Sequence, residues 1–185
     1  MSALFGTFVG HFQIPDSPGN TPSFIVNGVS EFDSAKIDET QLEQNHFAVL
    51  FYRKATPEYG VQVAAYARYS SLAFRPDPLP DLLFNGIAQR VDRSSIATGL
   101  QVDARYALTP SHTLRGGLLF GADRTSVQAT SSVLPAADGV QTSEQPFDVI
   151  DNTGKTGFTY SVYRPGRVAA PPLGDAQRGP PARRV

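Results

Sequence analysis

The chain has 185 residues, of which 16 are Lys or Arg and 17 are Asp or Glu, giving a formal charge of −1. This balance excludes a nucleic-acid binder held by bulk positive charge. The absence of cysteine excludes disulfides, thiolate metal sites and a cysteine nucleophile. No apolar run approaches the roughly 18 residues of a membrane-spanning helix. The first six residues lack the basic segment and long apolar core of a signal peptide, so we expect none there.

Residues 13–45 form a polar, proline-rich stretch that predicts a long connection. Its acids lack the regular oxygen-ligand spacing of a hand-type calcium loop, so we expect a solvated face rather than a cation site. These acids are Asp33, Asp38, Glu39 and Glu43. The histidines also lack the spacing of a metal site. They are His11, His46 and His112.

Residues 47–70 predict a first hairpin. Residues 47–52 are apolar, and residues 55–60 contain the proline and glycine of a turn. Beyond the turn, Val61, Val63 and Ala65 begin one face of an alternating strand that continues to Ser70. Alternation with a period of two is the pattern of a half-buried strand. Residues 71–94 then predict a second long connection.

The clearest alternation covers residues 96–122 and predicts a second hairpin. One face of its first strand holds Ile96, Thr98, Leu100, Val102, Ala104, Tyr106 and Leu108. After a short turn at 109–112, in which we expect His112 to cap the strand start, one face of the second strand holds Leu114, Gly116, Leu118, Phe120 and Ala122. The charged residues of these two strands, and of the strand at 61–70, fall on the faces opposite the apolar ones. They are Arg68, Asp103, Arg105, Arg115 and Asp123.

A third long connection is predicted at 128–155, followed by a strand from Thr156. At their junction, Gly154-Lys155-Thr156 resembles the end of a phosphate-binding loop. Position 149 is Val rather than the required Gly, so we interpret it as a loop end leading into a strand. The chain also has no nucleophile-elbow or Ser-x-x-Lys motif. We therefore predict that the protein is not an enzyme and assign no catalytic, cofactor-binding or metal-binding residue.

Residues 164–185 differ from the rest of the chain. They contain five Arg, five Pro and one acid, which leaves 11 bases and 16 acids in residues 1–163, and they contain none of the 19 Phe and Tyr residues. Such a segment cannot bury enough surface to offset its chain entropy, so we predict a disordered tail. Its charge would suit an acidic surface. We favour another interpretation, a frame-shifted tail, because Arg, Pro, Ala and Gly dominate when GC-rich DNA is translated out of frame.

The pattern as a whole predicts an all-β fold, an antiparallel sheet with unusually long strands and alternating short and long connections. Long strands with aromatic residues near their ends are typical of a transmembrane β-barrel. A small secreted β-sandwich that binds a ligand through its long loops would alternate in the same way. On periodicity alone the two alternatives are equally supported.

Several fragments resemble TonB-dependent outer-membrane receptors in their order and spacing over residues 11–163. The early fragments are Gln13-Ile14-Pro15, Ser17-Pro18-Gly19, Val26-Asn27-Gly28-Val29-Ser30, Phe32-Asp33-Ser34-Ala35, residues 37–41 and residues 45–50. The later ones are Arg68-Tyr69-Ser70, Phe74-Arg75-Pro76-Asp77, Leu83-Phe84-Asn85-Gly86, residues 99–103 and residues 112–117. In these receptors a strand like 160–163 tends to continue with Gln, Asp, Glu and Trp, whereas here Arg164-Pro165-Gly166 follows.

The resemblance implies a partial segment of the receptor β-barrel at 1–163, inactive alone. Members of the family have a signal peptide, a TonB box, a plug domain and a 22-stranded barrel, whereas five or six strands are recognisable here. It further implies the outer membrane of a Gram-negative cell, with lipid and the TonB energy-coupling complex as partners. The intact receptor would take up a scarce nutrient, either a chelated metal or an oligosaccharide. The short turns would be periplasmic and the long loops extracellular, and we assign no ligand-binding residues within those loops.

Overall fold

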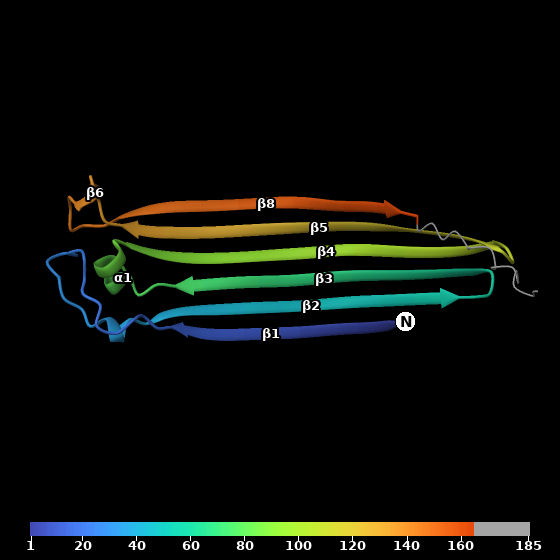
Figure 1. The fold of residues 1–185 in the computed structure, drawn as a ribbon, viewed down its shortest axis with the longest axis horizontal. Helices are drawn as coiled ribbons and strands as arrows, with labels where there is room; N and C mark the ends of the chain where they lie inside the picture. The colour runs from blue at the N-terminus through green and yellow to red at the C-terminus, as the bar shows by residue number, and fades with distance from the viewer. Residues whose placement is uncertain (165–185) are drawn as a thin grey trace, which may run out of the picture.

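The computed structural model describes residues 1–164 and is built on one antiparallel sheet of six strands (Figure 1). The predicted all-β fold is therefore confirmed. The strands lie in the order β1-β2-β3-β4-β5-β8. They are β1 (Ser2–Ile14), β2 (Glu39–Ala55), β3 (Tyr59–Arg75), β4 (Ile87–Thr109), β5 (His112–Val133) and β8 (Phe147–Tyr163). The predicted disorder and frame shift of 164–185 concern residues outside the described part, apart from Arg164.

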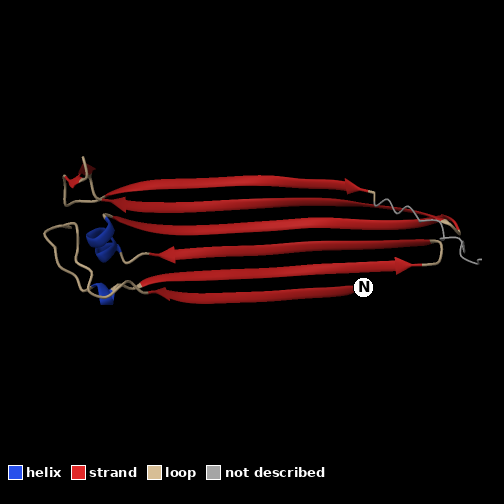
Figure 2. Ribbon diagram, viewed as in Figure 1, coloured by secondary structure: helices blue, strands red, loops and turns tan. Residues whose placement is uncertain are grey.

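Smaller elements occur between the long strands. They are the 3-10 turn η1 (Ser34–Lys36), the helix α1 (Pro78–Asn85) and the two-residue strands β6 (Ala136–Ala137) and β7 (Val140–Gln141). All of them lie at one end of the sheet (Figure 2). We call this the loop end, and it carries the connections 15–38, 76–86 and 134–146.

The opposite end, the turn end, carries the short turns 56–58 and 110–111, as predicted. The Thr56 amide donates to the Tyr59 carbonyl at 2.7 Å and closes the first turn. At the second turn, His112 is the first residue of β5, and its Nδ1 lies 2.9 Å from the Thr109 hydroxyl. The predicted capping role of His112 is thus confirmed.

The strands are longer than the sequence analysis predicted. β4 has 23 residues and starts at Ile87, β5 has 22 residues and reaches Val133, and β8 starts at Phe147. The predicted long connections at 13–45, 71–94 and 128–155 were therefore too long. The strand halves near the loop end carry polar residues on both faces, such as Asp92 on one and Arg93 on the other, so alternation does not reveal them.

Cross-strand partners share a face of the sheet, so the register sorts every strand residue onto one of two faces. One central row is apolar on all six strands and consists of Ala3, Leu50, Ala65, Leu100, Phe120 and Tyr160. The rows on either side of it contain Val63 and Ala67 and are equally free of charged residues. We call this side of the sheet the apolar face.

Charged and aromatic residues delimit the apolar rows. Toward the turn end the limit consists of Lys54, Tyr59 and Tyr106, and the Lys54 ammonium lies 5.6 Å from the centre of the Tyr59 ring. Toward the loop end it consists of His46, Tyr69 and Arg124, with the first two rings stacked at 6.1 Å. The apolar residues thus form a strip that crosses the strands and is limited at both ends. They do not extend along the full length of each strand.

The opposite side of the sheet carries Arg68, Asp103, Arg105, Arg115 and Asp123, and we call it the charged face. Aromatic rings lie flat over glycines on this face: Tyr66 over Gly99, and Tyr163 over Gly117. This arrangement covers a glycine backbone within a sheet and fixes the ring.

The sheet is not closed into a barrel, and both of its edges lack a neighbouring strand within residues 1–164. Every residue of the edge strand β8 is exposed, and Tyr160 and Val162 are 83% and 89% exposed. The sandwich alternative requires a second sheet over the apolar face. In the described part of the chain the only other sheet is the ribbon of β6 and β7, which is too short for that purpose.

The buried core lies at the loop end. It consists of Val26, Leu82, Leu83, Ala88 and Leu134, with Phe24, Phe32 and Phe84 packed against it. The helix α1 supplies its centre, because Leu83 is fully buried. Pro78 starts this helix, and Gly86 ends it in the left-handed conformation at φ 72°. The core therefore stabilises the long connections rather than the faces of the sheet.

Candidate functional site

The loop end is the first candidate site, because three connections converge there and are held together by backbone hydrogen bonds. The amides of Ser23 and Phe24 donate to the Leu83 carbonyl at 2.9 and 3.0 Å. The Leu134 amide donates to the Gly86 carbonyl at 2.9 Å. These bonds join residues from all three connections to α1, so the loops form one packed unit.

A second set of contacts fastens the tip of the first connection to the third. Residues 26–29 form a tight turn in which Asn27 and Gly28 have positive φ, the pattern of an Asn-Gly hairpin turn. The Gly28 amide donates to the Glu144 carboxylate at 2.7 Å. The Gln141 side chain accepts from the Ile25 amide at 3.0 Å and donates to the Ile25 carbonyl at 2.5 Å.

A polar cavity of about 510 Å³ lies where the first connection meets α1. Its lining contains three acids, and no Lys or Arg lines it. The acids are Asp16, Glu39 and Asp81, and the other lining residues are Ile14, Pro15, Asn20, Thr21, Ser23, Ile37, Phe84 and Asn85. Carboxylates, amides and hydroxyls are acceptor-rich, so the cavity suits a ligand that offers hydrogen-bond donors.

Asp81 is the most perturbed ionisable group at the loop end. Its side chain belongs to α1, and the residue is only 4% exposed. Burial, and then a hydrogen bond with the neighbouring Glu39 carboxyl, raise the pKa of Asp81 to about 8. Asp81 is therefore mostly protonated at neutral pH, and its hydrogen bond with Glu39 links α1 to the start of β2.

The acids predicted to form a solvated face have separate local roles. Asp33 accepts from the Ala35 amide at 3.1 Å and caps η1. Asp38 accepts from the Gln13 amide group at 3.1 Å, and Glu43 accepts from Gln41 at 2.6 Å. Glu39 differs, because it reaches the buried Asp81. In residues 1–164 no three His, Asp or Glu side chains are grouped so as to hold a metal ion.

The remaining motifs are dispersed over the sheet. His11 and His46 lie on β1 and β2, whereas His112 lies at the turn end. Gly154-Lys155-Thr156 lies in the interior of β8, so its interpretation as a loop end was wrong. The structure therefore gives these residues positions in regular strands.

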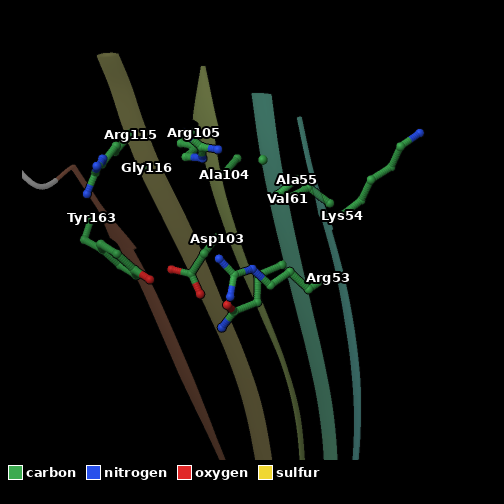
Figure 3. A pocket seen from close by; sticks show the side chains of 12 residues that line it. Arg53, Lys54, Ala55, Val61, Asp103, Ala104, Arg105, Arg115, Gly116 and Tyr163 are labelled. Carbon is green, nitrogen blue, oxygen red and sulfur yellow. The ribbon is translucent and has the colours of Figure 1, made fainter. Parts of the chain in front are cut away.

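The second candidate site lies on the charged face at the turn end, where a cavity of about 460 Å³ opens (Figure 3). Arg53, Asp103, Arg105, Arg115 and Tyr163 line it. These residues come from β2, β4, β5 and β8, and only the sheet register brings them together. The alternation predicts polar faces for Arg105 and Arg115, whereas Arg53 follows the apolar run 47–52 and is not marked by any pattern.

Comparisons of the chain with protein-family models, with curated proteins and with solved structures gave no match. Among the described residues, no helix has the length and apolar character needed to cross a membrane.

Proposed function

We propose that residues 1–163 are a segment of the barrel wall of a TonB-dependent outer-membrane receptor. The intact receptor would import a scarce nutrient, either a chelated metal or an oligosaccharide, with energy from the TonB complex. In this proposal the apolar face meets lipid and the charged face lines the barrel interior. The turn end faces the periplasm, and the loop end faces the cell exterior, where its cavity offers acceptor groups to a ligand.

The observation that carries the proposal is the height of the apolar band. Tyr59 and Tyr69 mark its two limits on β3 and are ten residues apart. At a rise of about 3.3 Å per residue this is about 33 Å along the strand. A strand tilted by about 40° would then span roughly 25 Å, the height of the lipid-facing band of outer-membrane barrels.

Three further features support it. Aromatic residues stand at both limits of the band, as at the two interfaces of a bilayer. Short turns lie at one end of the sheet and long connections at the other, which is the asymmetry of outer-membrane barrels. The long edge strands leave backbone groups unpaired, and further strands of a barrel would satisfy them.

The proposal is tested by vesicle flotation of the full chain, comparing Leu100→Arg with Gln101→Arg. These neighbours in β4 lie on opposite faces at the same height. An arginine at the midplane of a lipid-facing band costs about 2–4 kcal/mol, whereas one facing the interior is tolerated. We expect L100R to lose vesicle association and Q101R to keep it. Equal behaviour of the two variants would contradict the proposal.

A further inference from the structure

The charged face has an excess of positive charge at the turn-end cavity. Arg53, Arg105 and Arg115 line the cavity together with a single acid, Asp103. In Figure 3 the Lys54 side chain points away from this group, so three guanidinium groups and the Asp103 carboxylate define its charge. The excess is therefore local, although the chain as a whole carries a charge of −1.

The strand register places two of these arginines side by side, which is unfavourable unless a negative group lies between them. Arg105 and Arg115 are directly opposite each other on β4 and β5, and like charges in that position are destabilising. Within residues 1–164 none of the three arginines forms an ion pair, and Asp103 accepts a hydrogen bond from Gln101 at 2.9 Å. An anionic occupant would reduce the repulsion and supply charged acceptors for the guanidinium groups.

Side chains cover the glycines at the base of the cavity. The Tyr163 ring lies over Gly117, and Gly60 is covered as well. The Arg105 stem lies over Gly60, and its guanidinium donates to the Thr56 carbonyl at 3.0 Å. The Arg105 side chain is thus already positioned at the cavity.

We propose that this cavity binds an acidic polypeptide segment that crosses the strands on the charged face. Arg53 and Arg115 belong to β2 and β5, which are three strand spacings apart, or about 14 Å. The arginines come from three strands and are spread across the sheet, which suits an occupant with several negative groups, and alternate carboxylates of an extended segment are about 6.6 Å apart. Residues 165–185 do not supply such charge, because they contain four Arg and one Asp.

The inference rests on the proposed function in one respect, namely that the charged face lines an interior able to hold such a segment. The probe is a fluorescein-labelled peptide of six Glu-Ser repeats, titrated against the full chain in neutral-detergent micelles by fluorescence anisotropy. We expect the peptide to bind the chain and its affinity to fall as the salt concentration rises. Arg53→Gln and Arg115→Gln should each weaken it about tenfold, as expected for loss of a charge-assisted hydrogen bond. Arg68→Gln, on the same face but outside the cavity, should leave binding unchanged.

A charge exchange provides the second measurement. The double variant R105E/R115E should lose the Glu-Ser peptide and gain affinity for a Lys-Ser peptide of equal length. The proposal is overturned if the wild-type chain does not bind the acidic peptide or if R68Q weakens binding as much as R115Q. Displacement of the peptide by inorganic phosphate at equal concentration would also overturn it. The flotation test of L100R and Q101R reports on lipid contact of the apolar face. Its failure would contradict the proposed function, whereas failure of peptide binding would contradict only the present inference.

Discussion

Asp81 shows how a single buried carboxyl can couple the loop end to pH. Its pKa of about 8 lies far above the value of about 3.9 expected in the unfolded chain. Between these two values the folded protein binds more protons than the unfolded one. The free energy of unfolding therefore falls as pH rises through this range, and the stabilising effect of the protonated form is lost above about pH 8.

We therefore expect Asp81→Asn to reduce the pH dependence of the loop end, since an amide stays neutral. The measurement is hydrogen exchange of residues 78–86, corrected for intrinsic exchange, at pH 6 and pH 9. Wild-type protein should lose protection at pH 9, whereas D81N should retain it. Asp33→Asn serves as the control, because Asp33 is exposed and caps only η1. The same pH response in wild type and D81N would contradict this account.

The packing of aromatic rings on glycines leads to a second prediction about single residues. Tyr66 lies on Gly99, so the side chain of Gly99→Val would collide with the ring. We expect G99V to lower the free energy of unfolding by about 1–3 kcal/mol, the usual cost of overpacking. Gly157→Val is the matched control, since nothing lies within 4 Å of its added Cβ. Urea unfolding in micelles, followed by circular dichroism, measures both, and equal stability of the two variants would be inconsistent with the packing.

At the level of elements, the helix α1 organises the loop end. Leu83 is fully buried in the core, whereas Leu79 in the same helix is 37% exposed. We expect Leu83→Ala to cost about 2–5 kcal/mol of local stability and to release all three connections. Limited proteolysis should then cut 15–38 and 134–146 faster than in wild type. Leu79→Ala should not change the cleavage rate, and a similar rate for both variants would argue against a shared core.

The strands could be predicted only where their two faces differ in chemistry. Residues 96–122 alternate clearly because one face is apolar and the other polar, and both strands and their turn were found. From Ile87 to Ser95 both faces carry polar residues, so no periodicity marks that half of β4. α1 is only eight residues long, and the signal that was missed is the pair Pro78 and Gly86 at its two ends.

The candidate sites were less predictable than the strands. Asp81 becomes buried because three connections pack around α1, which no local pattern indicates. The turn-end cavity depends on register, which places Arg105 opposite Arg115 although they are ten positions apart in the chain. Composition and spacing along the chain identify charged residues but not which of them share a face across four strands.

At the scale of the whole molecule, the six long strands of residues 1–164 form one sheet with two free edges and two chemically different faces. The apolar strip crosses all six strands at one height, and charged and aromatic residues stand at both of its limits. A soluble sheet would cover such a strip with a second layer, because large apolar patches exposed to water favour association. We propose that lipid covers the strip and that water meets the other face.

The most direct test is a spin-label scan of residues 96–106 in lipid vesicles. The chain has no cysteine, so each single-cysteine variant carries one label at a known position. We predict that labels at even-numbered positions, including Leu100, collide with oxygen dissolved in the bilayer. Labels at odd-numbered positions, including Gln101, should collide with a water-soluble nickel complex. An accessibility profile without this period of two, or with both faces accessible to water, would contradict the account.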